Sequence, residues 1–234
     1  MRVLIACEYS GNTRRAFEMF GHDAWSCDLL PAEDGSDKHI QGDVRGVLAD
    51  GWDLMIAHPD CTYLTNSAEW AYGDGPYHQK VKPETLVGAA RRAARERALA
   101  FVKILLDAPI PSIGLENPVG AISSRIRPAD QYIQPYEFGH DASKKTGLWL
   151  KNLPPLKPTQ YIAPRMVCCG LVLPDAVGKY GCPNCNGDNT GRPRWGNQTN
   201  SGQNKLTPSA DRWKDRARTY SGWSMAMAEQ WGKL

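Results

Sequence analysis

The sequence predicts an α/β fold with a doubly wound, Rossmann-like sheet and a small cysteine-rich insertion. Short apolar runs rich in Val, Leu and Ile alternate with segments of helical periodicity through the first half of the chain. This alternation is typical of a mostly parallel sheet covered by helices on both faces. Further along the chain, a segment rich in Pro, Gly, Asn and Cys interrupts the pattern and indicates an insertion.

Apolar runs bounded by turn residues predict the strands. In chain order they are MRVLIACE (1–8), DAWSCDLLP (23–31), IQGDV (40–44), WDLMIAHP (52–59) and IPSIGLENP (110–118). Helical spacing predicts helices over 13–22 and 83–109, and a last helix from Tyr220 onward. Because ligands bind outside the carboxyl ends of the strands in such sheets, we expect a site among the residues that follow these runs.

The length of 234 residues fits one core domain with an appendage. We expect a core over residues 1–163, the insertion over 164–209, and a C-terminal helix within 210–234 that packs back on the core. The chain has 41% apolar residues, no apolar run long enough to span a bilayer and no N-terminal signal. These features predict a cytoplasmic protein that does not associate with membranes, and no protein partner is indicated.

The formal net charge of +3 permits a nucleic-acid partner without requiring one. Lysine and arginine cluster in two segments, and phosphate contact and a solvated helix face explain each cluster equally well. The first cluster contains Lys80, Lys82, Arg91, Arg92, Arg95 and Arg97, and the second contains Arg192, Arg194, Lys205, Arg212, Lys214, Arg216 and Arg218.

The turn after the first strand, with Ser10 and Gly11, predicts a cofactor site. Free backbone N–H groups and the positive end of the next helix suit an anionic group of a ligand, and Asp28, about twenty residues on, suits a ribose diol. A single glycine in CEYSGNT favours a small adenosine-containing cofactor over a dinucleotide. A purely structural turn is the alternative.

Cys61 and the pair Glu116-Asn117 follow two of the apolar runs. A cysteine alone is more often buried packing than a nucleophile. An acid and an amide are costly to bury at a strand end unless they are hydrogen-bonded or belong to a site, and we expect burial to raise the pKa of Glu116. A capping arrangement before Pro118 is the alternative. Together the three residues predict attack by sulfur while a carboxyl group handles a proton on the same substrate.

Five segments of the chain, taken in order, resemble the cytosine-C5 DNA methyltransferase family, in particular its small, divergent phage and prophage members. The segments are RRAFEMFGHDAWSCDLLP, IQGDV, WDLMIAHPDCTYL, GLENP and EFGHDASKKTGLWL. The resemblance covers residues 1 to about 156 and implies a methyltransferase-type sheet, DNA as partner and S-adenosylmethionine as cofactor. The cofactor contacts that it implies are Glu8, Ser10 and Gly11 near the amino-acid end, Asp28 on the ribose, Asp43 near the adenine, and Pro59.

The resemblance also assigns the chemistry. Cys61 matches the cysteine that attacks C6 of a flipped-out cytosine, Glu116 matches the glutamate that holds N3, and Asn117 supports the geometry. SKKTG replaces a motif rich in arginine, so Lys144 or Lys145 is expected to supply its positive charge. Asp60 stands where the family has proline, and its carboxylate would raise the pKa of the thiol unless it is paired.

The insertion contains Cys168, Cys169, Cys182 and Cys185. Seven cysteines without an export signal argue against a disulfide framework. Four thiolates at this spacing suit a tetrahedral structural zinc, with unligated thiols as the alternative. The neighbouring stretch RPRWGNQTNSGQNK, with Trp195, is either a contact region for DNA or an ordinary polar loop.

Three functions are compatible with these residues. The first is DNA cytosine-C5 methylation through a covalent intermediate on Cys61. The second is a pyrimidine C5-modifying enzyme that acts on a free nucleotide, which needs the same nucleophile and the same carboxyl group. The third is a catalytically inactive nucleic-acid-binding protein on a methyltransferase scaffold, consistent with Asp60 and the replaced motif.

Overall fold

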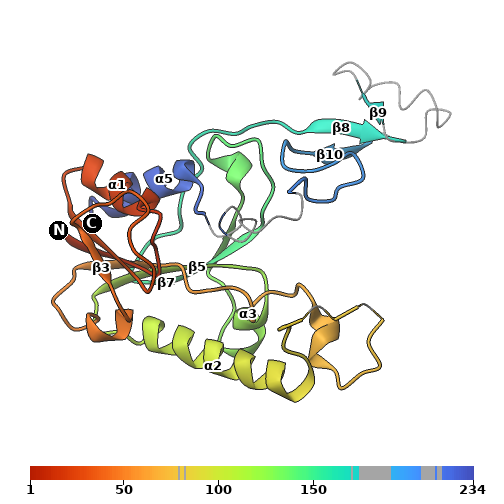
Figure 1. Cartoon of the computed structure of the whole chain (residues 1–234). Helices are drawn as coiled ribbons and strands as arrows, with labels where there is room; N and C mark the ends of the chain where they lie inside the picture. Colours follow the sequence, from red (N-terminus) through yellow and green to blue (C-terminus); the bar gives the residue numbers. More distant parts are fainter. Residues whose placement is uncertain (79, 82, 170, 174–190, 207–213, 215–217) are drawn as a thin grey trace.

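The computed structural model describes residues 1–234 apart from 79, 82, 170, 174–190, 207–213 and 215–217. A central sheet of seven strands lies between two helical layers, and a separate three-stranded sheet extends to one side (Figure 1). The prediction of an α/β fold with a mostly parallel central sheet is therefore confirmed. Among the described residues, no helix has the length and apolar character to cross a membrane.

The elements alternate along the chain much as the apolar runs predict. The strands of the central sheet are β1 (Arg2–Ala6), β2 (Asp23–Asp28), β3 (His39–Gln41), β4 (Leu54–Ala57), β5 (Ser112–Pro118), β6 (Gln131–Ile133) and β7 (Thr146–Lys151). The α-helices are α1 (Asn12–Met19), α2 (Gly88–Leu106), α3 (Ala121–Arg125) and α5 (Ser221–Trp231), and the short 3-10 turns are η1 (Val44–Gly46), η2 (Glu69–Tyr72) and η3 (Pro135–Glu137).

The strand order of the central sheet is β3-β2-β1-β4-β5-β7-β6. The first five strands are parallel, and β7 is antiparallel to both β5 and β6. This order differs from the Rossmann order only by the antiparallel β7 inserted before the last strand. The order reverses between β1 and β4, so ligands are expected outside the carboxyl ends of these two strands.

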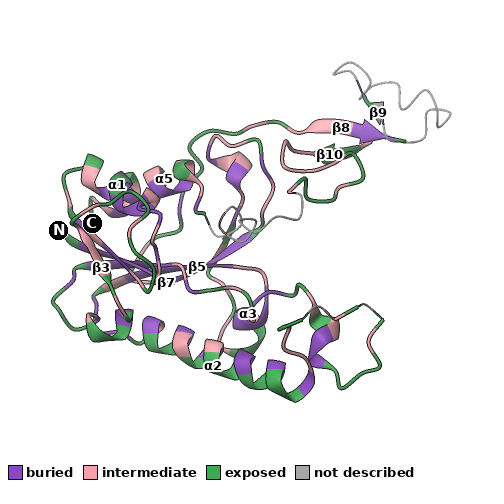
Figure 2. Ribbon diagram, in the orientation of Figure 1, coloured by how far each residue is buried: buried purple, intermediate pink, exposed green. Residues whose placement is uncertain are grey.

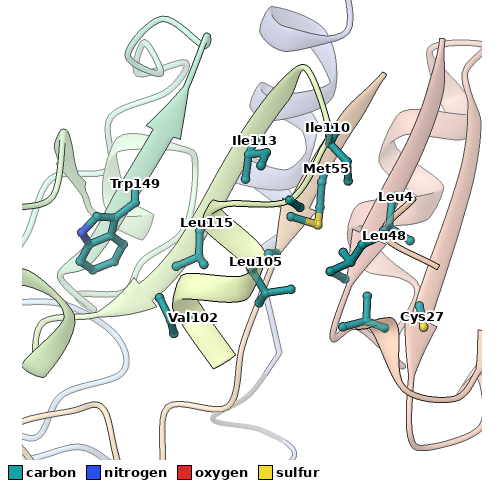
Figure 3. Close-up of a cluster of buried hydrophobic side chains, with 14 of the residues drawn as sticks. Leu4, Cys27, Leu48, Met55, Val102, Leu105, Ile110, Ile113, Leu115 and Trp149 are labelled. Atoms are coloured by element: carbon teal, nitrogen blue, oxygen red, sulfur yellow. The ribbon is translucent and has the colours of Figure 1, made fainter. Parts of the chain in front are cut away.

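Alternate residues of each strand face opposite helical layers. Val3 and Ile5 pack with α1 and α5, whereas Leu4 packs with α2 on the other face. Figure 3 shows part of the apolar cluster on the α2 face of the sheet. In it, Val102 and Leu105 of α2 lie beneath Leu4, Met55 and Leu115 of the strands. The inner strands β1, β4 and β5 are buried on both faces (Figure 2), which explains why their sequences are largely continuous apolar runs.

Some boundaries differ from the prediction. The helix expected from residue 83 begins at Gly88, because Glu84 has a φ of 64° and cannot belong to a helix. The strands β6 and β7 were not predicted, and neither was the second sheet, in the order β10-β8-β9, which is built from β8 (Arg165–Cys168), β9 (Leu171–Val172) and β10 (Arg192–Arg194). The last helix is observed as α5, which packs against α1.

Candidate functional site

A cavity of about 590 Å³ opens at the carboxyl ends of β1, β2 and β4. Its volume is in the range that holds a small-molecule cofactor. Six of its lining residues are Glu8, Ser10, Asp28, Asp43, His58 and Asp60. Four of the predicted cofactor residues therefore line it, whereas Gly11 and Pro59 do not appear in its lining. The cavity lies at the switch point of the strand order, as expected for a doubly wound sheet.

Glu8 occupies the N-terminus of α1 with its own carboxylate. Its Oε1 accepts a hydrogen bond from the N–H of Thr13 at 2.7 Å, and its Oε2 accepts one from the N–H of Arg14 at 3.1 Å. Gly11, the residue before the helix, adopts a φ of 69° and has no side chain to cap it. The free N–H groups expected for an anionic ligand are thus already bonded to a buried carboxylate.

Two more carboxylates line the cavity at the ends of β2 and β3. Burial raises the pKa of Asp28, although its Oδ1 accepts a hydrogen bond from the N–H of Leu30 at 2.9 Å. Asp43 caps η1 and binds the guanidinium of Arg45, which lowers the pKa of Asp43 to about 2. Asp43 therefore has an internal cationic partner, whereas Asp28 is held by backbone hydrogen bonding and presents a carboxyl group to the cavity.

Two cysteines that the sequence did not single out also line the cavity. Burial raises the pKa of Cys7 far above its usual range and raises the pKa of Cys27 to about 11, and the charge of Asp28 adds to both shifts. Both thiols are therefore neutral at pH 7 and serve as apolar wall rather than as nucleophiles.

The Cys61 loop, residues 58–66, follows β4 and forms a tight turn. The carbonyl of Cys61 accepts hydrogen bonds from the N–H groups of Leu64 at 3.0 Å and Thr65 at 3.1 Å. Asp60 is exposed, and its Oδ1 accepts hydrogen bonds from the N–H and the hydroxyl of Thr62, at 3.0 and 2.7 Å. The carboxylate that precedes Cys61 is thus bonded within the turn.

The Cys61 loop is fixed to the end of β5. The Nδ2 of Asn117 donates to the carbonyl of Pro59 at 2.8 Å, and the N–H of Ala121 donates to the carbonyl of Leu64 at 2.7 Å. A Cβ on Gly120 would lie 1.8 Å from that same carbonyl oxygen, so the close approach requires glycine. The structure therefore brings together the loop of Cys61 and the Glu116-Asn117 pair.

Glu116 is buried, with 7% of its surface exposed. Its Oε2 lies 3.2 Å from Nδ1 of His58, and its Oε1 has no hydrogen-bond partner among the described residues. Burial acts to raise the pKa of Glu116, but the hydrogen bond to His58 and the charge of Lys144 outweigh it, so the net shift is downward. The expectation of a raised pKa is wrong, because the sequence did not reveal the imidazole beside the carboxylate.

His58 is a residue of the candidate site that the sequence interpretation missed. It is the first residue after β4, its side chain is 7% exposed, and it lines the cavity on one side while it contacts Glu116 on the other. Its Nε2 lies 3.4 Å from Oγ1 of Thr13, which in turn lies 3.1 Å from Oγ of Ser224 on α5. Its position at the end of an apolar run was the one feature of the sequence that could have indicated a place in the site.

No protein-family model and no curated protein matches this sequence. The chemistry of the site therefore has to be argued from its own residues.

Lys144 and Lys145 lie in the loop before β7. The N–H of Lys144 donates to Oε1 of Gln134 at 3.0 Å, and its charge acts on Glu116. The ammonium of Lys145 lies 4.5 Å from the centre of the Tyr132 ring. Of the two, Lys144 is therefore the one that the structure brings to Glu116.

The insertion docks on the same loop. Asn197 and Ser143 exchange two hydrogen bonds of 3.0 and 2.9 Å, and the N–H of Gly196 donates to Asp141 at 2.7 Å. Trp195 stacks on Tyr136 with ring centres 4.3 Å apart. Trp195, one of the residues considered for DNA contact, thus has a structural role in this docking.

The first basic cluster is largely structural as well. Arg91 and Arg95 are buried, with 6% and 8% exposed. The guanidinium of Arg95 lies 3.4 Å from the centre of the Tyr72 ring, pairs with Glu69 and donates to the carbonyl of Tyr63. These arginines fix the segment that follows Cys61 rather than form a solvated face. Among the described members of the cluster, exposed ones such as Arg97 remain for phosphate contact, and Lys82 lies outside the described residues.

Of the four predicted zinc ligands, Cys168 and Cys169 are described, and Cys182 and Cys185 lie outside the described residues. The two sulfur atoms of Cys168 and Cys169 are 3.7 Å apart. Two thiolates on a tetrahedral zinc, at about 2.3 Å each, lie about 3.8 Å from one another. The separation of this pair fits one edge of such a site.

Proposed function

We propose that the protein transfers a methyl group from S-adenosylmethionine to C5 of cytosine in DNA through a covalent bond between Cys61 and C6. The observation that supports this best is the buried Oε1 of Glu116, which lacks a partner among the described residues and lies on the strand end fixed to the Cys61 loop. A buried acceptor without a partner is costly, and a ligand donor would satisfy it.

The proposed reaction uses these residues in sequence. The thiolate of Cys61 bonds to C6 while Glu116 holds the Watson–Crick edge of the extruded base. Electron density moves to C5, which accepts the methyl group supplied by the cofactor. The C5 proton then leaves to solvent, the S–C6 bond breaks, and the thiolate is regenerated.

The charges around the cavity support a cationic cofactor. Both arginines of its lining are ion-paired, Arg45 with Asp43 and Arg218 with Glu33. Glu8, Asp28 and Asp60 form no ion pair within the described part of the chain. A ligand with ammonium and sulfonium groups is attracted to this lining, whereas a pyrophosphate would meet the carboxylate of Glu8 where it needs free N–H groups.

The test is incubation of the protein with methyl-labelled S-adenosylmethionine and duplex DNA that contains 5-fluorocytosine, followed by denaturing electrophoresis. We expect a labelled covalent adduct for the wild type, because fluorine blocks the loss from C5 that releases the enzyme. Cys61→Ser removes the adduct, whereas Glu96→Gln, a change on the exposed face of α2, retains it. Absence of both an adduct and donor binding would contradict the proposal.

A free pyrimidine nucleotide is the second candidate substrate, and one observation favours it. Arg91 and Arg95, which the sequence offered for phosphate contact, are buried in contacts with the protein itself. A parallel incubation with 5-fluoro-dCMP separates the two substrates, since only the nucleotide enzyme would form an adduct with it. Donor binding without an adduct on either substrate would instead indicate an inactive binding protein.

We also propose that the insertion binds one structural zinc ion through Cys168, Cys169, Cys182 and Cys185. The spacing of the described pair supports this assignment. Metal analysis of purified protein should give one zinc per chain, and Cys168→Ser should reduce it, with the Cys27→Ser protein as a control. Full retention of zinc in the Cys168→Ser protein would contradict the assignment.

A further inference from the structure

His58 lies between the cavity and Glu116, and it contacts both the strand side and the helix side of the site. Its Nδ1 faces Oε2 of Glu116 at 3.2 Å, and its Nε2 faces the hydroxyl of Thr13 at 3.4 Å. Thr13 is the residue whose N–H binds Glu8, and its side chain is fully buried. One imidazole therefore spans the distance from α1, beside the cofactor cavity, to the carboxylate at the end of β5.

We propose that His58 is a positioning residue that holds Oε2 of Glu116 and so leaves Oε1 as the acceptor for the substrate. This inference rests on the proposed function for the identity of the substrate, but the geometry of the carboxylate does not depend on it.

The hydrogen-bonding chemistry fixes the form of the imidazole. An ionised carboxylate only accepts, so Nδ1 bears the proton in the contact with Glu116. In the neutral tautomer Nε2 then accepts from the hydroxyl of Thr13, and the hydroxyl of Ser224 completes the chain at 3.1 Å. The two ring nitrogens therefore have separate roles, one toward the carboxylate and one toward α1.

The charges around Glu116 agree with this role. The groups that face its carboxylate are His58 from the end of β4, Lys144 from the loop before β7, and Thr146 of β7. His58 and Lys144 both favour the ionised form of Glu116, which presents an acceptor to the base. The exocyclic amine of cytosine is a donor that this acceptor can receive.

Two variants separate the roles of the two nitrogens. His58→Asn places an amide nitrogen where Nδ1 is and keeps the contact with Glu116, whereas His58→Gln places it where Nε2 is and keeps the contact with Thr13. We expect His58→Gln to slow adduct formation about 10- to 100-fold, the value of a charge-assisted hydrogen bond. We expect His58→Asn to remain within about 10-fold of the wild type. His22→Gln is the matched control, because His22 lies just before the amino end of β2, whereas His58 follows the carboxyl end of β4.

A second measurement does not need activity. Titration of ¹³C-labelled glutamate carboxyl groups by NMR, with Glu116→Gln to assign the signal, reports the ionisation of Glu116 directly. The pKa of Glu116 should be highest in His58→Gln, intermediate in His58→Asn and lowest in the wild type and His22→Gln proteins.

The opposite order of the two variants, with His58→Gln close to the wild type in rate and titration, would show that His58 serves only to anchor α1. That result would overturn the inference. If the wild type forms no adduct while the titration follows the expected order, the proposed substrate is wrong and the positioning role stands.

Discussion

Replacement of Glu8 by glutamine tests the unusual capping of α1. The carboxylate is 4% exposed and accepts from two backbone N–H groups, at 2.7 and 3.1 Å. An amide retains one acceptor oxygen and turns a donor toward the second N–H group. The variant therefore loses one charge-assisted hydrogen bond and the favourable charge at the positive end of the helix.

The magnitude follows from these two losses. A hydrogen bond to a charged group contributes about 1.5–3 kcal/mol, and a carboxylate at a helix N-terminus contributes about 0.3–1 kcal/mol. The easier burial of a neutral amide offsets part of the sum, so the free energy of unfolding should fall by about 2–3 kcal/mol. For a chain of this length each kcal/mol lowers the Tm by roughly 2–4 °C, which gives a decrease of about 4–12 °C.

Differential scanning calorimetry measures the Tm, and calorimetric titration with S-adenosylmethionine tests the proposed contact of Glu8 with the cofactor. Glu96→Gln makes the same chemical change on the exposed face of α2 and should leave both quantities unchanged. Weaker cofactor binding is expected for Glu8→Gln, because the cavity loses a carboxylate. Equal Tm values for the two variants would refute the assigned role of Glu8 at the helix N-terminus.

Three further substitutions have definite expected outcomes. Asp28→Asn should stabilise the protein at pH 7, because burial raises the pKa of this carboxyl and ionisation is therefore unfavourable; the gain should vanish below about pH 4 in urea titrations. Arg95→Met should weaken the segment after Cys61 by about 2 kcal/mol, seen as faster amide exchange there, whereas exposed Arg97→Met should not. Asn117→Ala should slow adduct formation by about 10-fold while donor affinity, measured by calorimetry, changes little.

The apolar runs were sufficient to predict the parallel half of the sheet, because strands buried on both faces require continuous apolar sequence. They did not reveal β7, which lies antiparallel between β5 and β6. The strands of the second sheet have two to four residues, too few for a period to be recognised.

The candidate site was predictable where chemistry coincides with a strand end. Glu8 and Asp28 follow β1 and end β2, and both line the cavity. The role of His58 depends on contacts with Thr13 and Glu116, 45 and 58 residues away, and no local pattern indicates them. The same holds for Arg91 and Arg95, because a run of charge does not show which members are buried beneath aromatic rings.

The docking of the insertion has a consequence for how the chain unfolds. Two backbone groups of Ser143 and one carboxylate of Asp141 find their partners in residues 196–197, and Tyr136 stacks on Trp195. A chain cut at residue 163 would leave these groups and that ring face unsatisfied. The change of composition at 163–164 therefore does not separate two units that unfold independently. We expect the loop that contains Lys144 to unfold together with the insertion, in one step.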